Sequence, residues 1–130
     1  MSLNKVMLIG HLGQDPDLRY LPTTGQPVAS FSVATDEAYT DKQGNRQERV
    51  EWRHVVVFGK LALTCEKYLA KGRQAFVEGR LRTREYEAKN NGAKRQRTEI
   101  VAARVQFLGA PPADAKETAV EEQPDADDLL

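Results

Sequence analysis

Arginine recurs at every second position in the stretch EGRLRTREY, residues 78–86, and a tyrosine follows in the same phase. Side chains two apart in a β-strand point to the same face, so this pattern predicts a basic stripe that ends in an aromatic ring. The stripe comprises Arg80, Arg82, Arg84 and Tyr86. A row of guanidinium groups can neutralise phosphates, and a tyrosine can stack on a base. No acid stands between these arginines along the strand, and neighbouring like charges repel unless an anion separates them, so a merely solubilising face is the weaker interpretation.

A second stretch, VEWRHVVVFGK at residues 50–60, has two apolar faces if it forms a strand. Val55 and Val57 share one face and can fill a core. The other face carries Trp52, His54, Val56 and Phe58, with Lys60 just beyond them. A second apolar face needs a partner, which would be nucleic acid or another subunit. The alternative is that Trp52 and Phe58 are plain core residues.

Aromatic rings beside basic side chains suit a single-stranded nucleic acid. Unpaired bases stack at roughly 1–3 kcal/mol each, and Lys and Arg along a groove neutralise the backbone. Tyr39 and Lys42, at the end of one predicted strand and in its turn, extend this chemistry to a hairpin. Duplex DNA would require a recognition helix, and the one predicted helix has Glu66 beside Lys67 on its outer side and no basic face.

Most of residues 1–109 shows apolar alternation with a period of two, which predicts strands rather than helices. The five predicted strands span about 4–13, 25–39, 47–59, 73–87 and 97–109. Turn residues separate two pairs of them: DKQGN at 41–45, and NNG at 90–92, which supplies the positive-φ residues of a hairpin.

One stretch, KLALTCEKYLAKG at residues 60–72, departs from this alternation. Its apolar residues Leu61, Cys65, Tyr68 and Leu69 fall on one helical face, and Gly72 stands where a C-cap is expected. Five strands with one helix between the third and fourth form the plan of an all-β OB-fold, a small Greek-key barrel. A barrel of SH3 type is the alternative, and the position of the helix argues against it.

The composition excludes several kinds of site. Cys65 is the only cysteine, so neither a disulfide within the chain nor a Cys-based zinc site can form. His11 and His54 have no acids at ligand spacing, so we expect no metal site. No phosphate-binding loop or nucleophile motif occurs either, so we expect that the protein binds no cofactor and is not an enzyme. The apolar run at 6–9 is far below the ~20 residues that cross a bilayer, and we expect a cytoplasmic protein without membrane association.

The formal net charge of zero is the sum of two unlike parts. Residues 1–113 carry 18 Lys and Arg against 12 Asp and Glu, whereas residues 114–130 carry one lysine against seven acids. From residue 110 onward the chain has three prolines, no aromatic residue and no periodic apolar face. We therefore expect a folded domain at 1–109 and a disordered linker with an acidic tip at 110–130.

Four blocks carry a resemblance to a known family: NKVMLIGHLGQDPDLRY, VEWRHVVVFGKLA, YLAKG and VEGRLRTREY. In their order and spacing, over residues 3–109, the chain resembles the bacterial single-stranded DNA-binding proteins. The resemblance implies an OB-fold that binds single-stranded DNA without sequence preference, usually as a homotetramer, and that has no catalytic activity. It also implies a part in DNA replication, recombination and repair at the nucleoid.

The family's functional positions can be transferred residue by residue. The resemblance assigns base stacking to Tyr39, Trp52, Phe58 and Tyr86. It assigns backbone contacts to Lys42, Lys60, Arg82 and Arg84. Arg53 and His54 stand in the reverse of the order found in well-known relatives, so by parity His54 lies on the DNA side and Arg53 on the side used between subunits.

The ending QPDADDLL also fits the resemblance. Family members carry a flexible linker and an acidic tip, closed by apolar residues, that docks replication and repair proteins. The tip residues are Asp125, Asp127, Asp128, Leu129 and Leu130, and two leucines replace the usual Pro-Phe ending. The acidic tail can also compete with DNA for the basic domain. A plain solubilising tail is the alternative.

Two other functions stay open at this level. A primosome-type OB protein would act mainly through protein contacts, but such proteins lack an acidic tip. An assembly or scaffold protein would use Trp52 and Phe58 only as an oligomer interface.

Overall fold

The computed structural model describes residues 1–88 and 92–109, together with the backbone of 120–122. Five strands close into a barrel in the order β1-β5-β6-β4-β3, and β1 pairs with β3 to complete it. Their bounds are β1 Val6–Leu12, β3 Pro27–Thr40, β4 Arg46–Phe58, β5 Gln74–Glu87 and β6 Lys94–Leu108. The helix α1, Lys60–Tyr68, lies between β4 and β5 in the chain. The predicted all-β OB-fold is confirmed.

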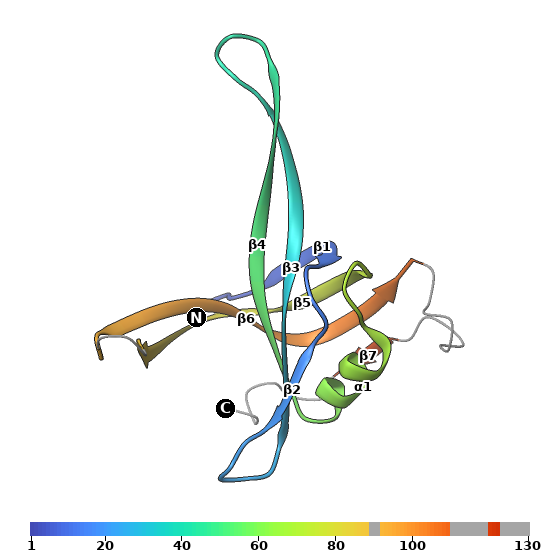
Figure 1. Cartoon of the computed structure of the whole chain (residues 1–130), viewed down its shortest axis with the longest axis vertical. Coiled ribbons are helices and arrows are strands. Elements are labelled where there is room, and N and C mark those ends of the chain that lie inside the picture. Colours follow the sequence, from blue (N-terminus) through green and yellow to red (C-terminus); the bar gives the residue numbers. More distant parts are fainter. Residues whose placement is uncertain (89–91, 110–119, 123–130) are drawn as a thin grey trace.

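Alternate residues of the strands fill the barrel, because successive side chains of a strand point to opposite faces. On β4 the inward residues are Val55 and Val57, both fully buried, as predicted. Phe31 and Phe107 are the largest apolar side chains in this core. The helix adds the buried Leu61 and packs across the end of the barrel (Figure 1).

The helix ends earlier than predicted. Tyr68 is its last residue, and Leu69 is already extended while its N–H donates to the carbonyl of Cys65. The predicted C-cap at Gly72 is therefore wrong. Gly72 instead has a φ of 87°, and its N–H donates to the carbonyl of Leu12 at 2.8 Å, so it forms the turn into β5.

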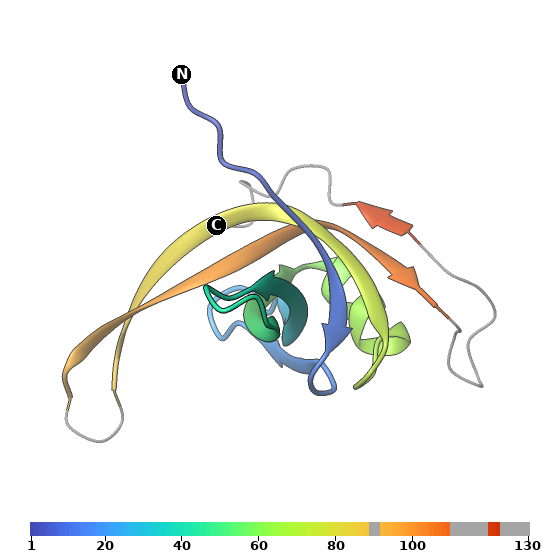
Figure 2. The ribbon, with the colours of Figure 1, turned by 90° about the horizontal axis from the view of Figure 1, so that it is seen from above.

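Two long hairpins extend beyond the barrel. Figure 1 shows β3–β4 and β5–β6 leaving it in different directions, and Figure 2 shows β5 and β6 as one curved arm. The predicted turn at 41–45 is confirmed: Asp41 Oδ1 accepts hydrogen bonds from the N–H groups of Gln43 and Asn45. In the second turn residues 89–91 lie outside the described residues, and Gly92 has a positive φ.

Two further strands were not predicted. The first, β2 Asp17–Tyr20, pairs antiparallel with β3 and makes a short hairpin beside the barrel. Its sequence, DLRY, is too short to show alternation. The second, β7 Val120–Glu122, pairs with residues 104–106 of β6. This strand lies within the stretch predicted to be disordered. It was not predicted because a strand can pair through its backbone with the open edge of β6 without any apolar pattern in its own sequence.

The remaining residues of the predicted tail, 110–119 and 123–130, lie outside the described residues. Within the described part of the chain, no helix has the length and apolar character needed to cross a membrane.

Candidate nucleic-acid interface

A pocket of about 580 Å³ opens on the outer face of the barrel, beside the β2–β3 hairpin. It brings together four of the predicted site residues: His54, Phe58, Arg82 and Arg84. The other lining residues are Asp17, Arg19, Leu21, Val28, Ser30, Val56, Arg97 and Glu99. A cleft of this size with several converging charged groups is typical of a binding site.

The phenyl ring at the pocket wall is almost covered. Phe58 keeps only 6% of its surface exposed and packs with Val56 and Val101 under Leu21 and Val28. The second apolar face predicted for β4 thus finds part of its partner within the chain. The guanidinium carbon of Arg82 lies 5.5 Å from the centre of the Phe58 ring.

A buried carboxylate lies under the predicted basic stripe. The side chain of Glu99 has no exposed surface, and its Oε1 accepts hydrogen bonds from Arg82 Nε at 3.2 Å and from a terminal nitrogen of Arg82 at 2.5 Å. Arg84 Nε is 3.7 Å from the same oxygen, and His54 Nε2 is 3.8 Å from Oε2. The expectation that the stripe has no acid among its arginines holds along β5 but is wrong for the face as a whole.

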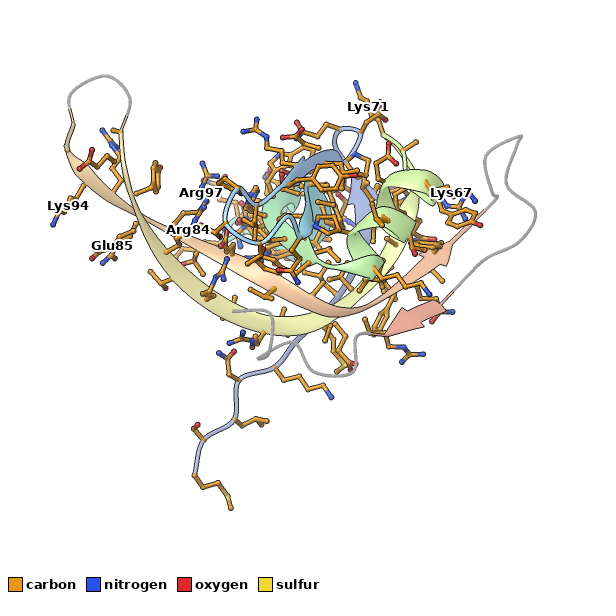
Figure 3. The ribbon with its side chains drawn as sticks, turned by 90° about the horizontal axis from the view of Figure 1, so that it is seen from below. Lys67, Lys71, Arg84, Glu85, Lys94 and Arg97 are labelled. Atoms are coloured by element: carbon orange, nitrogen blue, oxygen red, sulfur yellow. The ribbon has the colours of Figure 1, made fainter. Side chains whose placement is uncertain are left out.

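The turn predicted at 90–92 does not find this residue. Glu99 is directly opposite Arg82 in the β5–β6 ladder, whereas counting outward from the NNG turn would place Ile100 there, one residue away. Arg97 was missed for the same reason, since it is opposite Arg84. Figure 3 shows Arg84 and Arg97 next to each other on the arm formed by β5 and β6. Three guanidinium groups, those of Arg82, Arg84 and Arg97, share this pocket with the carboxylate of Glu99, so positive charge is left in excess and suits a phosphate.

His54 is the titratable group of the pocket. Burial lowers the pKa of His54, and the positive charges of Arg97 and Arg84 lower it further, while Glu99 opposes them. The imidazole of His54 is therefore mainly neutral above the ordinary histidine pKa. An anion that entered the pocket would favour its protonated form.

Three predicted stacking rings lie outside the pocket and are open to solvent. Trp52 is 59% exposed, Tyr39 is 50% exposed and Tyr86 is 37% exposed. Tyr39 lies on the β3–β4 arm with the guanidinium of Arg49 at 5.8 Å from its ring centre. Tyr86 lies on the β5–β6 arm with that of Arg97 at 5.3 Å. Each arm thus combines an exposed ring with a cation.

The remaining predicted residues are spread more widely. Lys42 is exposed in the turn of the β3–β4 arm, and Lys60 is exposed at the start of α1. Arg80 is half-buried opposite Val101 and does not line the pocket. Strand parity places Leu81 on the same face of β5 as the buried Val77, but Leu81 is 47% exposed, two residues past the last residue of β5 that pairs with β1.

The acidic tip, residues 125–130, lies outside the described residues. No group of three His, Cys, Asp or Glu side chains suited to a metal occurs among the residues that the structure describes.

The comparison with protein families decides the assignment. Residues 3–108 match the model of the single-strand binding protein family. The chain belongs to that family. A relative called "Single-stranded DNA-binding protein 1", from Chlorobaculum tepidum, is 53% identical over 109 residues, which cover 84% of this chain and 67% of the relative. A Neisseria meningitidis "Single-stranded DNA-binding protein" is 47% identical and is covered over 62% of its length. The chain thus spans about two thirds of these relatives, or slightly less.

Solved structures agree with this family assignment. "Plasmodium falciparum SSB complex with ssDNA" has a TM-score of 0.76 and 37% identity, and the match covers 84% of this chain and 97% of that one. A deletion mutant of the Thermus aquaticus single-stranded DNA binding protein has a TM-score of 0.72 and 34% identity, over 82% of this chain and 51% of that one.

Proposed function

We propose that this protein binds single-stranded DNA without sequence preference, by stacking bases on exposed rings and by contacting phosphates with Lys and Arg. The observation that carries the proposal is the presence of three exposed rings on the strands of the barrel and its arms, together with a pocket lined by arginines. The rings are Trp52, Tyr39 and Tyr86. Stacking on each ring contributes roughly 1–3 kcal/mol and tolerates any base, because every base has a π-face. Membership of the single-strand binding family and the likeness to a relative in complex with single-stranded DNA support it.

The arginines of the pocket supply the phosphate contacts in this proposal. Arg84 has half of its side chain exposed and faces Arg97 across the ladder. Lys42, in the turn of the β3–β4 arm, and Lys60, at the start of α1, are exposed and would add phosphate contacts outside the pocket. Binding should weaken with salt at a slope of roughly −0.7 for each phosphate neutralised.

We also infer that the protein assembles with copies of itself, as the family's usual tetramer. On β1, Met7 is 62% exposed and Ile9 is 54% exposed, and residues 6–10 of this strand pair with β5 on one side only. Phe76 lies beside Ile9 in the ladder and continues the apolar surface. An apolar face at an open strand edge suits a second copy of the same strand.

Arg53, on the opposite side of β4 from His54, has a carboxylate oxygen of Glu37 at 3.9 Å.

The wider role follows from DNA coating. We infer that the protein protects single strands in replication, recombination and repair, in the cytoplasm at the nucleoid. Its tip, with Asp125, Asp127, Asp128, Leu129 and Leu130, would recruit replication and repair proteins. Two terminal leucines flanked by acids suit an apolar pocket with a basic rim. It would act as a binding protein and not as an enzyme.

A scaffold protein is the second candidate, in which Trp52 and Phe58 serve an oligomer interface. The burial of Phe58 within its own chain argues against that use. The deciding experiment is a titration of the full chain with oligothymidine while the fluorescence of Trp52, the only tryptophan, is followed at low and high salt. Base stacking should quench the emission strongly. Unchanged emission throughout the titration would reject stacking at Trp52 and favour the scaffold.

A further inference from the structure

Side chains from three neighbouring strands are joined at the pocket wall: Phe58 on β4, Arg82 on β5 and Glu99 on β6. The guanidinium of Arg82 lies over the Phe58 ring, and two of its nitrogens donate to Oε1 of Glu99. About a quarter of the Arg82 side chain is exposed, whereas the ring below it is buried. A ligand that enters the pocket here therefore meets the guanidinium before it meets the phenyl ring.

Glu99 has no direct access to a ligand. Its side chain has no exposed surface, so no atom of it can touch DNA in this arrangement. Its negative charge also opposes the attraction of a phosphate to Arg82 and Arg84. Its effect must pass through the groups that it holds, and the strongest of these contacts is the pair of hydrogen bonds from Arg82.

We propose that Glu99 is a positioning residue that holds Arg82 over Phe58, so that Arg82 presents a stacking plane to a base of single-stranded DNA. The planar guanidinium stacks on bases as aromatic rings do. The neighbouring Arg84 and Arg97 would contact the phosphate groups of the DNA. The inference rests on the proposed DNA binding and changes one assignment within it: Arg82 acts mainly by stacking and not by phosphate contact.

Replacement of Arg82 by lysine tests the stacking plane, because lysine keeps the charge but not the plane. Oligothymidine affinity should be measured for the full chain at about 1 M salt, where phosphate contacts are largely screened. We expect Arg82→Lys to lose about tenfold in affinity there. Arg104→Lys is the matched control: the guanidinium carbon of Arg104 also lies over a phenyl ring, 5.8 Å from the centre of Phe76, but Arg104 does not line the pocket. The affinity of this variant should stay within about twofold of the parent.

Replacement of Glu99 by glutamine tests the positioning. Removal of a negative charge beside phosphate sites would by itself tighten binding. If Glu99 positions Arg82, Glu99→Gln should instead weaken binding several-fold at about 1 M salt. Circular dichroism shows whether this variant folds, and if it does not, the two lysine variants decide alone.

The outcomes separate this inference from the proposed function. No binding by the parent would reject the function itself. The role of Arg82 alone would be overturned if the parent binds and Arg82→Lys binds as tightly as the parent at about 1 M salt. It would also be overturned if the control Arg104→Lys loses as much affinity as Arg82→Lys. If a folded Glu99→Gln variant binds more tightly than the parent both at low salt and at about 1 M salt, the role of Glu99 is overturned.

Discussion

The indole of Trp52 lies directly against the backbone of Gly13. A Cβ placed on Gly13 would be only 2.3 Å from Cζ3 of Trp52 and 2.7 Å from its Cη2. Gly13 follows β1, and its N–H donates to the carbonyl of Ser32 at 3.0 Å, which fixes it beside the base of the β3–β4 arm. The absence of a side chain at Gly13 therefore determines where the exposed indole can lie.

Substitution of Gly13 by alanine should turn the indole away from this position. Because Trp52 is more than half exposed, we expect a small loss of stability, within about 1 kcal/mol. DNA affinity should fall by about tenfold, the worth of one misplaced stacking ring. The near-ultraviolet circular dichroism and emission of Trp52 should change before any DNA is added.

A double-mutant cycle shows whether the effect passes through the ring. In a Trp52→Ala background, Gly13→Ala should cause no further loss of affinity, since the two residues would act as one unit. An equal loss in both backgrounds would mean that Gly13 affects DNA binding through the backbone and not through Trp52.

DNA affinity should depend on pH through His54. The pKa of His54 is lowered by burial and by Arg97, so the imidazole is neutral at neutral pH, and a bound phosphate would favour its charged form. Binding should therefore take up a proton, and affinity should rise by up to about tenfold between about pH 8 and about pH 5.5. His54→Gln should lack this rise, and a rise of the same size in the variant would assign it to another group.

The lowered pKa of His54 should make the folded protein less stable at low pH, where DNA binding is expected to be tighter. A histidine whose pKa is lowered in the folded state binds a proton more readily in the unfolded chain, whose pKa is near 6.5. Stability is then complete above that value and falls as pH drops from about 6.5 to the lowered pKa of His54. Urea denaturation at several pH values should show this fall in the parent and less of it in His54→Gln.

The apolar surface of β1 should hold two copies together. Ile9 is exposed in the single chain, so Ile9→Glu should leave the fold intact but place a charge in the proposed interface. Sedimentation should show a smaller assembly, while affinity for an oligothymidine that spans one subunit stays within about twofold. Leu63→Glu is the control, because Leu63 is 41% exposed on α1, away from β1. An unchanged assembly in Ile9→Glu would place the interface elsewhere.

Strand parity predicted much of this molecule because it is a local property of the chain. It identified Val55 and Val57 as core and Trp52 as exposed, and the structure confirms both. The burial of Phe58 could not be predicted in this way, because the residues that cover it come from the β2–β3 hairpin, and β2 has no alternation. Arg82 and Glu99 come together through strand register, which neither strand shows by itself and which the count from the NNG turn misses by one residue.

The acidic tail should weaken DNA binding at low salt. A chain that ends at Gly109 loses seven acids and one lysine, while its remaining residues keep an excess of six basic side chains. We expect it to bind oligothymidine several-fold more tightly than the full chain at low salt, with the difference disappearing at about 1 M salt, since the competition is electrostatic.

Truncation also removes β7 and leaves residues 104–106 of β6 without that pairing, so a second variant is needed. Full-length protein with Asp125, Asp127 and Asp128 changed to asparagine keeps β7 and should show part of the same gain. If only the truncated chain binds more tightly, the gain comes from the freed edge of β6 and not from the loss of charge.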